Sequence, residues 1–94
     1  MIKTFKCKET QKIFELHGSK KIAVGAQKIA LRKLEMLDYA VEIRDLRVPP
    51  ANRLEQLKGN RKGQYSIRIN QQWRVRFVWR NGHAYQVEIV DYHK

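Results

Sequence analysis

The feature that most restricts the fold is a two-residue alternation of apolar and polar side chains in the C-terminal third of the chain. It occupies residues 65–69, 73–79 and 85–89, and it is typical of strands that bury one face. The apolar positions are Tyr65, Ile67, Ile69, Trp73, Val75, Phe77, Trp79, Tyr85, Val87 and Ile89. A sheet with this much apolar surface on one side needs a second layer, which only the N-terminal half of the chain can supply.

The N-terminal half has the helical periodicity that such a layer requires. Residues 25–40 carry apolar side chains at helical spacing, namely Ala26, Ile29, Ala30, Leu34 and Leu37. Shorter helical turns are predicted for residues 10–17 and 41–46, and a short strand for residues 2–5. The sequence therefore predicts an α+β fold in a single domain, residues 1–94, with N-terminal helices packed on one face of a small, twisted, mainly antiparallel sheet.

The turn between the last two strands has to keep both apolar stripes on one face. A two-residue turn at Asn81-Gly82 would place the stripe of one strand opposite polar side chains of the next. A three-residue turn over residues 80–82 pairs Trp79 with His83 and places the apolar side chains of the two strands opposite one another. We therefore predict the three-residue turn.

Two other connections follow from similar arguments. A three-residue turn over residues 70–72 pairs Arg68 with Arg74. The two prolines at residues 49–50 end any helix and predict an extended linker into Asn52. The sheet and the helical half are therefore expected to be separated by a short extended segment.

Charge is the strongest compositional signal. The 94 residues include 20 lysines and arginines against 9 aspartates and glutamates, which gives a formal net charge of +11. A domain this basic repels itself unless an anionic partner neutralises it, and nucleic acid is the first candidate because bound phosphates release counterions. The polar face of the predicted sheet carries part of this charge on Ser66, Arg68, Arg74, Arg76, Arg80, Gln86, Glu88 and Tyr92.

Other features narrow the setting of the protein. Cys7 is the single cysteine, so an internal disulfide is excluded and a reducing cytosol is expected. No apolar run approaches the roughly 18 residues that a membrane span needs, and the N-terminus has no secretory pattern. We therefore expect a cytoplasmic protein without a membrane partner. Residues 35–47 are net negative, which predicts either a solvated helix face or part of a protein-binding surface.

Three features of the sequence are suited to chemistry on an RNA phosphate. Lys58 precedes a turn bracketed by Gly59 and Gly63, where the backbone can approach a phosphate closely. Arg74 is anchored in a strand and can clamp a phosphate with two hydrogen bonds. The third feature is a C-terminal run of groups capable of proton transfer, Asp91, Tyr92 and His93. A solvated turn and an idle tail are the structural alternatives for the first and third features.

RNA carries its own nucleophile, the 2′-OH, so cleavage needs proton transfer and charge stabilisation but no metal. Lys58 and Arg74 suit charge stabilisation, and the C-terminal run suits proton transfer. Glu55, three residues before Lys58, is a fourth proton-transfer candidate. Histidines, cysteines and carboxylates do not cluster with metal-ligand spacing, so neither a metal nor another cofactor is predicted. Further RNA contacts are predicted at Arg53, Arg61, Lys62, Arg68 and Arg76.

Three segments, residues 52–70, 72–77 and 90–93, give the chain a family resemblance. Their residue patterns and their order resemble the HigB-type toxins of the RelE/ParE superfamily, and the likeness covers nearly the whole chain. The resemblance implies a fold similar to a microbial RNase and a bacterial toxin that enters the ribosomal A site, contacts 16S rRNA and cleaves mRNA. It also implies a HigA-like helix-turn-helix antitoxin as partner. The toxin would associate with operator DNA only through this antitoxin.

The resemblance also implies an active site. Carried over residue by residue, the site falls on Lys58, Arg74, Asp91, Tyr92 and His93. One departure concerns Glu55, because some members of the family have a histidine at that position. Either the carboxylate of Glu55 replaces the histidine in proton transfer, or His93 and Tyr92 perform this step.

Two other functions remain open from the sequence. ParE-like relatives on the same fold poison DNA gyrase by binding alone, and a non-catalytic RNA-binding module would also fit the composition. Lys58 and the C-terminal run, residues 91–93, favour the nuclease, because a binding protein needs no proton-transfer groups there.

Overall fold

A sheet with helices on one face forms the fold. The computed structural model describes residues 1–59 and 63–91. Within these residues the sheet is antiparallel and has four strands in the order β1-β2-β3-β4. Its predicted α+β class is confirmed. The elements are α1 (Lys8–Phe14), α2 (Val24–Tyr39), the 3₁₀ helices η1 (Ile43–Arg47) and η2 (Pro50–Asn52), β1 (Glu55–Gln56), β2 (Gln64–Arg68), β3 (Trp73–Arg80) and β4 (His83–Asp91).

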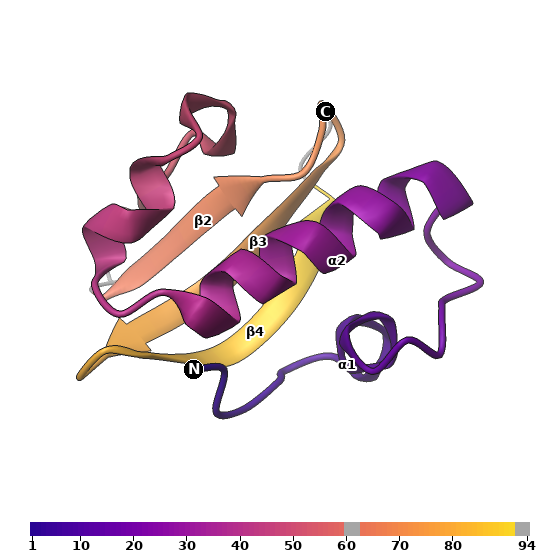
Figure 1. Ribbon diagram of the computed structural model, residues 1–94, viewed down its shortest axis with the longest axis horizontal. Helices are drawn as coiled ribbons and strands as arrows, with labels where there is room; N and C mark the ends of the chain where they lie inside the picture. Colours follow the sequence, from indigo (N-terminus) through magenta and orange to yellow (C-terminus); the bar gives the residue numbers. More distant parts are fainter. Residues whose placement is uncertain (60–62, 92–94) are drawn as a thin grey trace.

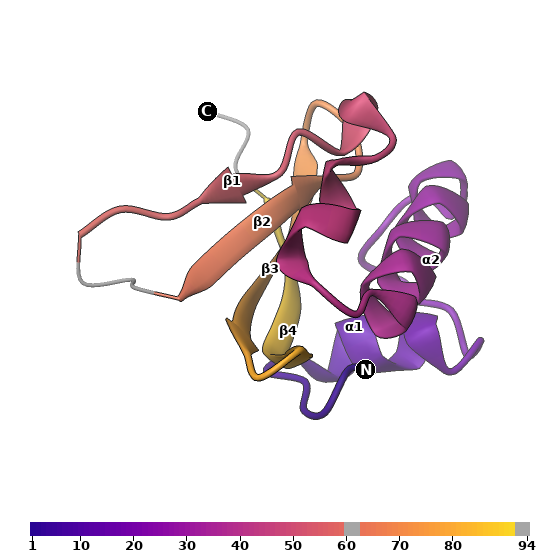
Figure 2. The same ribbon diagram turned by 60° about the vertical axis from the view of Figure 1, so that its left-hand side comes forward.

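The core lies between α2 and the sheet. Figure 1 shows α2 crossing in front of the sheet, and Figure 2 shows α1 and α2 on the same side of it. Ala30, Leu34 and Leu37 of the helix are fully buried and share one cluster with the equally buried Ile67 and Val75 of the sheet. Each large side chain buried in this way stabilises the fold by about 1.5–3 kcal/mol. Both tryptophans pack against this cluster, as the alternation predicts.

The connection between α2 and the sheet is more helical than predicted. The turns expected over residues 10–17 and 41–46 are present as α1 and η1, displaced by a few residues. The extended linker expected after residues 49–50 is wrong, because Pro50 begins the 3₁₀ helix η2. Proline is favourable at the first position of a helix, where its missing N–H would have no partner in any case.

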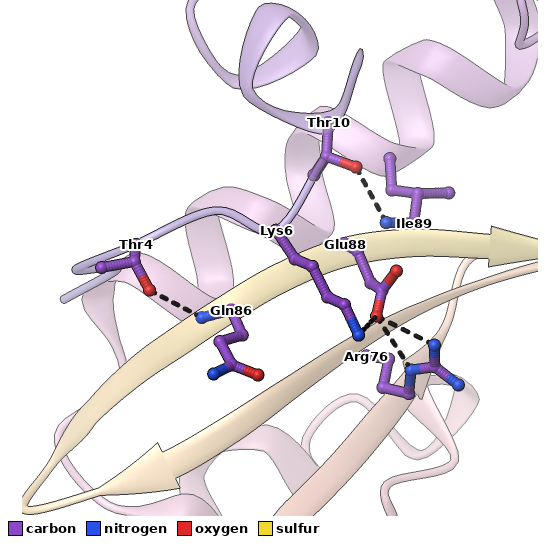
Figure 3. Close-up of polar contacts among 7 residues, drawn as sticks. All are labelled: Thr4, Lys6, Thr10, Arg76, Gln86, Glu88 and Ile89. Carbon is purple, nitrogen blue, oxygen red and sulfur yellow. Dashed lines mark hydrogen bonds and ion pairs between the residues drawn. The ribbon is translucent and has the colours of Figure 1, made fainter. Parts of the chain in front are cut away.

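The N-terminal segment is not the strand predicted for residues 2–5. It makes two isolated parallel bridges to β4, Ile2 with Ala84 and Phe5 with Val87. Between the bridges, the backbone N–H of Gln86 donates to the Thr4 hydroxyl at 2.8 Å, so a side chain replaces the backbone ladder there (Figure 3). This substitution explains why the pairing does not continue as a strand.

The turn between β3 and β4 also differs from the prediction. It is a two-residue turn in which Asn81 and Gly82 have φ values of 53° and 80°, and Arg80 pairs directly with His83. Positive φ at both positions is typical of the hairpin turn whose twist matches that of its strands. The predicted three-residue turn is therefore wrong.

A bulge in β4 restores the match between apolar faces. Val78 pairs with Tyr85, whereas Arg76 pairs with Glu88, so β4 contains one more residue than β3 over this interval. Gln86 lies in the bulge with φ of 52°. After the bulge, Val87 and Ile89 lie on the covered face and Glu88 lies on the opposite face. Tyr85 precedes it and shares the face of Val78, so the prediction of Tyr85 on the covered face is wrong.

The remaining connections give a mixed result. The predicted pairing of Arg68 with Arg74 across residues 70–72 is confirmed. β1 was not predicted, because a two-residue strand leaves no periodic signal in the sequence; it pairs Glu55 with Ser66. In the described part of the chain, neither helix has the length and apolar character needed to cross a bilayer.

Candidate active site

The face of the sheet turned away from the helices carries the candidate site. Residues that pair directly across neighbouring strands share a face, so strand register defines its members. Glu55 pairs with Ser66, Ser66 with Arg76, and Arg76 with Glu88, while Arg68 pairs with Arg74. The predicted placement of Ser66, Arg68, Arg74, Arg76 and Glu88 on one face is confirmed, while Tyr92, predicted with them, lies outside the described residues. We call this surface the open face.

Arg74 is the most firmly held charged side chain of the open face. Only 6% of the residue is exposed. Its Nε donates to the Ser66 hydroxyl at 2.9 Å, and its Nη2 donates to the Ser66 carbonyl at 3.3 Å and to the Arg53 carbonyl at 2.6 Å. Planar guanidinium groups with several fixed donors lose little further entropy on binding an anion. Arg74 therefore provides a positive charge in a defined position.

Glu55 is in direct contact with Arg74. An oxygen of its carboxylate lies 3.4 Å from Nη1 of Arg74, and 61% of the Glu55 side chain is exposed. β1 brings the two together by pairing Glu55 with Ser66, which is itself a partner of Arg74. The structure thus joins two of the predicted site residues, a fixed cation and an accessible carboxylate.

Arg53 contributes its backbone to the site. It follows η2 directly and has left-handed φ and ψ of 45° and 55°, a conformation that costs about 1–2 kcal/mol for residues other than glycine. Its carbonyl accepts the hydrogen bond from Arg74 Nη2, while the Arg53 residue as a whole is exposed. Sequence reasoning predicted Arg53 as an RNA contact but missed this backbone role.

Lys58 lies at the same edge of the sheet but outside β1. It is exposed and stands three residues beyond Glu55. Three residues span at most about 10 Å, so a phosphate between Lys58 and Glu55 is within reach of the lysine side chain. Leu57 anchors this segment by donating its backbone N–H to the Gln64 carbonyl at 2.9 Å.

Asp91 ends β4 next to Arg74 along the sheet. It pairs with Trp73, so by register it follows the face of Trp73, while Val90 pairs with Arg74. Gln72 Nε2 donates to its carboxylate at 3.2 Å. Four predicted site residues, Arg61, Lys62, Tyr92 and His93, lie outside the described residues.

Arg76 differs from Arg74 in its partner. Its Nε and Nη2 donate to one oxygen of Glu88 at 3.2 and 2.9 Å, and Lys6 Nζ lies 3.6 Å from the same oxygen (Figure 3). The side chain of Glu88 is 15% exposed. The charge of Arg76 is therefore partly compensated within the protein by a carboxylate that it shares with Lys6. Gln64 and Gln86 join these three residues in lining a polar pocket on the open face.

Ser66 is a site residue that sequence reasoning did not single out. It is 4% exposed, and both its hydroxyl and its carbonyl accept hydrogen bonds from Arg74. A signal was present, because Ser66 is a small polar residue on the open side of an alternating strand. The predicted RNA contact Arg68 is held differently, since its Nε donates to the Asn70 carbonyl at 3.1 Å.

Local structure accounts for most of the acidic segment, residues 35–47. Asp38 accepts the Ile2 backbone N–H at 2.8 Å, and Glu42 pairs with Arg44 at 2.9 Å. Asp45 accepts the backbone N–H groups of Val41 and Glu42 at 3.0 Å. The hydrogen bonds from Glu42 and then Val41 lower the pKa of Asp45 below its usual value. Asp45 thus stabilises the junction of α2 and η1, and Asp38 connects α2 to the N-terminal segment.

Comparison with known proteins places the chain in a family. The family described as "RelE-like toxin of type II toxin-antitoxin system HigB" matches residues 3–93. The chain belongs to the HigB-like toxin family. This result confirms the resemblance seen in the sequence, and a toxin of this type has an antitoxin as its partner.

Individual relatives agree with the family assignment. The toxin is 34% identical over 93 residues to "Endoribonuclease HigB" of Proteus vulgaris, a match that covers 99% of this chain and 100% of the relative. It is 52% identical over 63 residues to "Toxin HigB-1" of Vibrio cholerae serotype O1, covering 67% of this chain and 65% of that protein. An uncharacterized protein of Haemophilus influenzae is 43% identical over 61 residues, which is 60% of its length.

Proposed function

We propose that this toxin is an endoribonuclease that cleaves mRNA on the ribosome in the cytoplasm without a metal ion. The observation that carries the proposal is the fixed, nearly buried Arg74 on a basic open face, in contact with the accessible carboxylate of Glu55. The family match and the name of the Proteus relative support this function rather than gyrase poisoning. A non-catalytic RNA-binding module is also less well supported.

The proposed reaction uses the 2′-OH of the RNA as nucleophile. This oxygen loses its proton to a base and attacks the adjacent phosphorus, while the bond from phosphorus to the 5′-oxygen breaks. The products are a 2′,3′-cyclic phosphate and a 5′-OH, which receives a proton from an acid. Arg74 and Lys58 stabilise the negative charge that accumulates on the phosphoryl oxygens. The proton-transfer candidates are Glu55, Asp91, Tyr92 and His93.

The contacts between Arg74 and Glu55 favour a carboxylate role in this reaction. Glu55 lies beside the cation that would hold the phosphate, and its exposed side chain can reach a bound RNA. We propose that Glu55 takes the place of the histidine that some family members have here. In this arrangement the arginine positions the phosphate and the carboxylate at the same time.

The remaining basic residues are proposed to bind RNA backbone. Arg53, Arg61, Lys62, Arg68 and Arg76 would contact ribosomal RNA or mRNA phosphates, mostly without reading sequence. Arg76 is expected to contribute least, because Glu88 already compensates its charge. Ribosomal placement would fix an in-line geometry that a small catalytic set cannot impose on free RNA. The proposed antitoxin is a helix-turn-helix protein similar to HigA.

The proposal predicts strong dependence on the ribosome. Purified toxin should cleave mRNA in a translating ribosome complex and leave the same mRNA nearly intact in free solution. A His93→Gln variant should lose cleavage and growth inhibition while it keeps the circular dichroism spectrum of the fold. Equal cleavage rates on free and ribosome-bound mRNA would contradict ribosome dependence, and undiminished toxicity of the variant would remove His93 from the site.

A further inference from the structure

We propose that Lys33 and Asn52, buried behind the open face, are positioning residues that hold Arg74 in place through the backbone carbonyl of Arg53. The structural part of this proposal concerns the toxin alone. Its catalytic consequence rests on the proposed function, because it assumes that Arg74 acts on the RNA phosphate.

Asn52 is the centre of the arrangement. It is fully buried at the end of η2, and its side-chain amide donates to the Leu46 carbonyl at 3.1 Å and to the Val48 carbonyl at 3.4 Å. Its Oδ1 accepts a hydrogen bond from Lys33 Nζ at 2.5 Å. One side chain thus fixes η1, the segment after it and η2 relative to α2.

Lys33 contributes to the orientation of this amide. An ammonium group only donates, so it can face Oδ1 but not the amide nitrogen of Asn52. The carbonyls of Leu46 and Val48 only accept, so the lysine donor and these two acceptors select the same orientation of the amide. Without the lysine, Oδ1 would lose the donor that these contacts give it.

The position of Lys33 is otherwise difficult to explain. The residue is 8% exposed on the core side of α2, and no carboxylate among residues 1–59 and 63–91 pairs with it. Burial, and then the nearby charge of Arg32, lower the pKa of Lys33 below its usual value. Burying an ammonium group is unfavourable, so an apolar side chain would suit this position better if packing were its only role.

A short path leads from Asn52 to Arg74. The next residue, Arg53, is held in the left-handed region, and its backbone N–H donates to the Pro50 carbonyl at 3.0 Å. In this conformation its carbonyl points at Arg74 Nη2, which it meets at 2.6 Å. Any shift of η2 therefore moves the acceptor of a site hydrogen bond.

The Arg53 carbonyl complements the contacts made by Ser66. Ser66 belongs to the sheet and holds the guanidinium from β2. The Arg53 carbonyl approaches from the segment attached to the helical layer and fixes a second edge of the same planar group. Loss of this contact would remove the support of Nη2 from the η2 side and shift the guanidinium, which Ser66 and Glu55 would still hold on the open face.

The experiment measures Arg74 directly in the purified toxin. Arginine side-chain N–H signals are recorded by ¹⁵N NMR for the wild type, Asn52→Ala and Lys33→Met. The same substitution on the exposed side of α2, Lys28→Met, is the matched control. We expect both buried-site variants to shift the Arg74 signal and to raise its exchange with water by about tenfold or more, and the control to leave it unchanged.

Two further variants separate positioning from general loss of structure. Arg53→Gly keeps the carbonyl and the left-handed backbone, so the Arg74 signal should be retained. Lys33→Arg keeps a donor toward Asn52 and should restore the signal. Methionine is similar in length to lysine, so Lys33→Met is expected to fold. If Asn52→Ala does not fold, Lys33→Met alone decides whether the buried residues position Arg74. An unchanged Arg74 signal in folded Lys33→Met would overturn the proposal.

Activity gives a separate test of the catalytic consequence. In single-turnover cleavage on translating ribosomes, Lys33→Met should lower the rate at saturation by about 10- to 100-fold and leave the half-saturating concentration unchanged. A general loss of structure would instead lower the active fraction and the melting temperature together. If the wild type cleaves no RNA while the NMR result holds, the proposed function fails and the positioning role stands. A shifted signal with full cleavage would overturn the catalytic consequence.

Discussion

Arg74 and Arg76 stand two residues apart on the same strand and the same face, yet they are held in different ways. Arg74 is bound by neutral oxygens of Ser66 and Arg53, with one exposed carboxylate beside it. Arg76 is bound by Glu88, whose side chain is 15% exposed. Neutral acceptors fix a cation without compensating its charge, whereas the partly buried Glu88 carboxylate compensates charge that Arg76 and Lys6 share. On this basis we expect Arg74 rather than Arg76 to make the stronger contact with a phosphate.

The Arg76 contacts have a structural role of their own. Glu88 joins Arg76 of β3 to Lys6 of the N-terminal segment (Figure 3). The N-terminal segment is attached to β4 by the two bridges at Ile2 and Phe5 and by neighbouring hydrogen bonds, and the ion pair of Lys6 with Glu88 adds a side-chain contact to them. We therefore expect Arg74 to serve the proposed site and Arg76 mainly to stabilise the fold.

The largest expected effect tests this division directly. Arg74→Ala should lower ribosome-dependent mRNA cleavage by about 10²- to 10³-fold, the loss that follows removal of a fixed charge from a transition state. Arg76→Ala should lower it by at most about tenfold. Arg47→Ala is the control, because it removes an exposed arginine at the end of η1 that belongs neither to the Arg74 contacts nor to the Arg76 contacts. Similar losses for Arg74→Ala and Arg76→Ala would remove the distinction.

Removal of the carboxylate partners should affect stability in the opposite order. The loss should be larger for Glu88, the partner of Arg76, than for Glu55, the partner of Arg74. Glu88→Ala leaves two cations without their partner in a partly buried position and should lower the free energy of unfolding by about 1–3 kcal/mol. Glu55→Ala removes an exposed carboxylate and should change it by no more than about 0.5 kcal/mol. Urea titrations followed by circular dichroism measure both. A larger loss from Glu55→Ala would mean that the Arg74 contacts also serve mainly to stabilise the fold.

The smallest expected effect is a pH dependence of stability. It concerns Arg74 but not Arg76, because we propose that the buried Lys33 supports Arg74. The pKa of Lys33 is lowered in the folded protein, whereas it has its ordinary value of 10.5 in the unfolded chain. The unfolded chain therefore binds the Lys33 proton more tightly than the folded protein does. The contribution of Lys33 to stability should therefore rise with pH between its folded pKa and 10.5. The difference in unfolding free energy between wild type and Lys33→Met should increase over this window. A constant difference would contradict the burial of the charged form.

Local patterns predicted those parts of the fold that depend on neighbouring residues. The period of Ala30, Leu34 and Leu37 predicted α2, and the alternation predicted the covered face of β3. The parity argument for the last hairpin correctly required one extra residue but placed it in the turn. Nothing local shows that Gln86 adopts positive φ, because its N–H is satisfied by Thr4, more than 80 residues away in the chain.

The candidate site was predictable only in part for the same reason. Arg74 was identified from its strand and its charge, and Glu55 from its spacing to Lys58. The supports of Arg74 depend on segments that meet only in three dimensions, so Ser66 and the Arg53 carbonyl were missed. A lysine on the apolar side of α2 gives no sequence signal that distinguishes it from a solvated one.

The bulge at Gln86 also sets the phase of everything that follows it in β4. Side chains alternate between the two faces of a strand, and one bulged residue shifts this alternation by one position. If Gln86 were paired regularly instead, Val87 would lie opposite Arg76, and Val87 and Ile89 would turn toward water. Deletion of Gln86 should therefore remove the bulge and still leave Glu88 opposite Arg76 and Ile89 opposite Val75. The bulge thus absorbs the one extra residue that a two-residue turn leaves in β4.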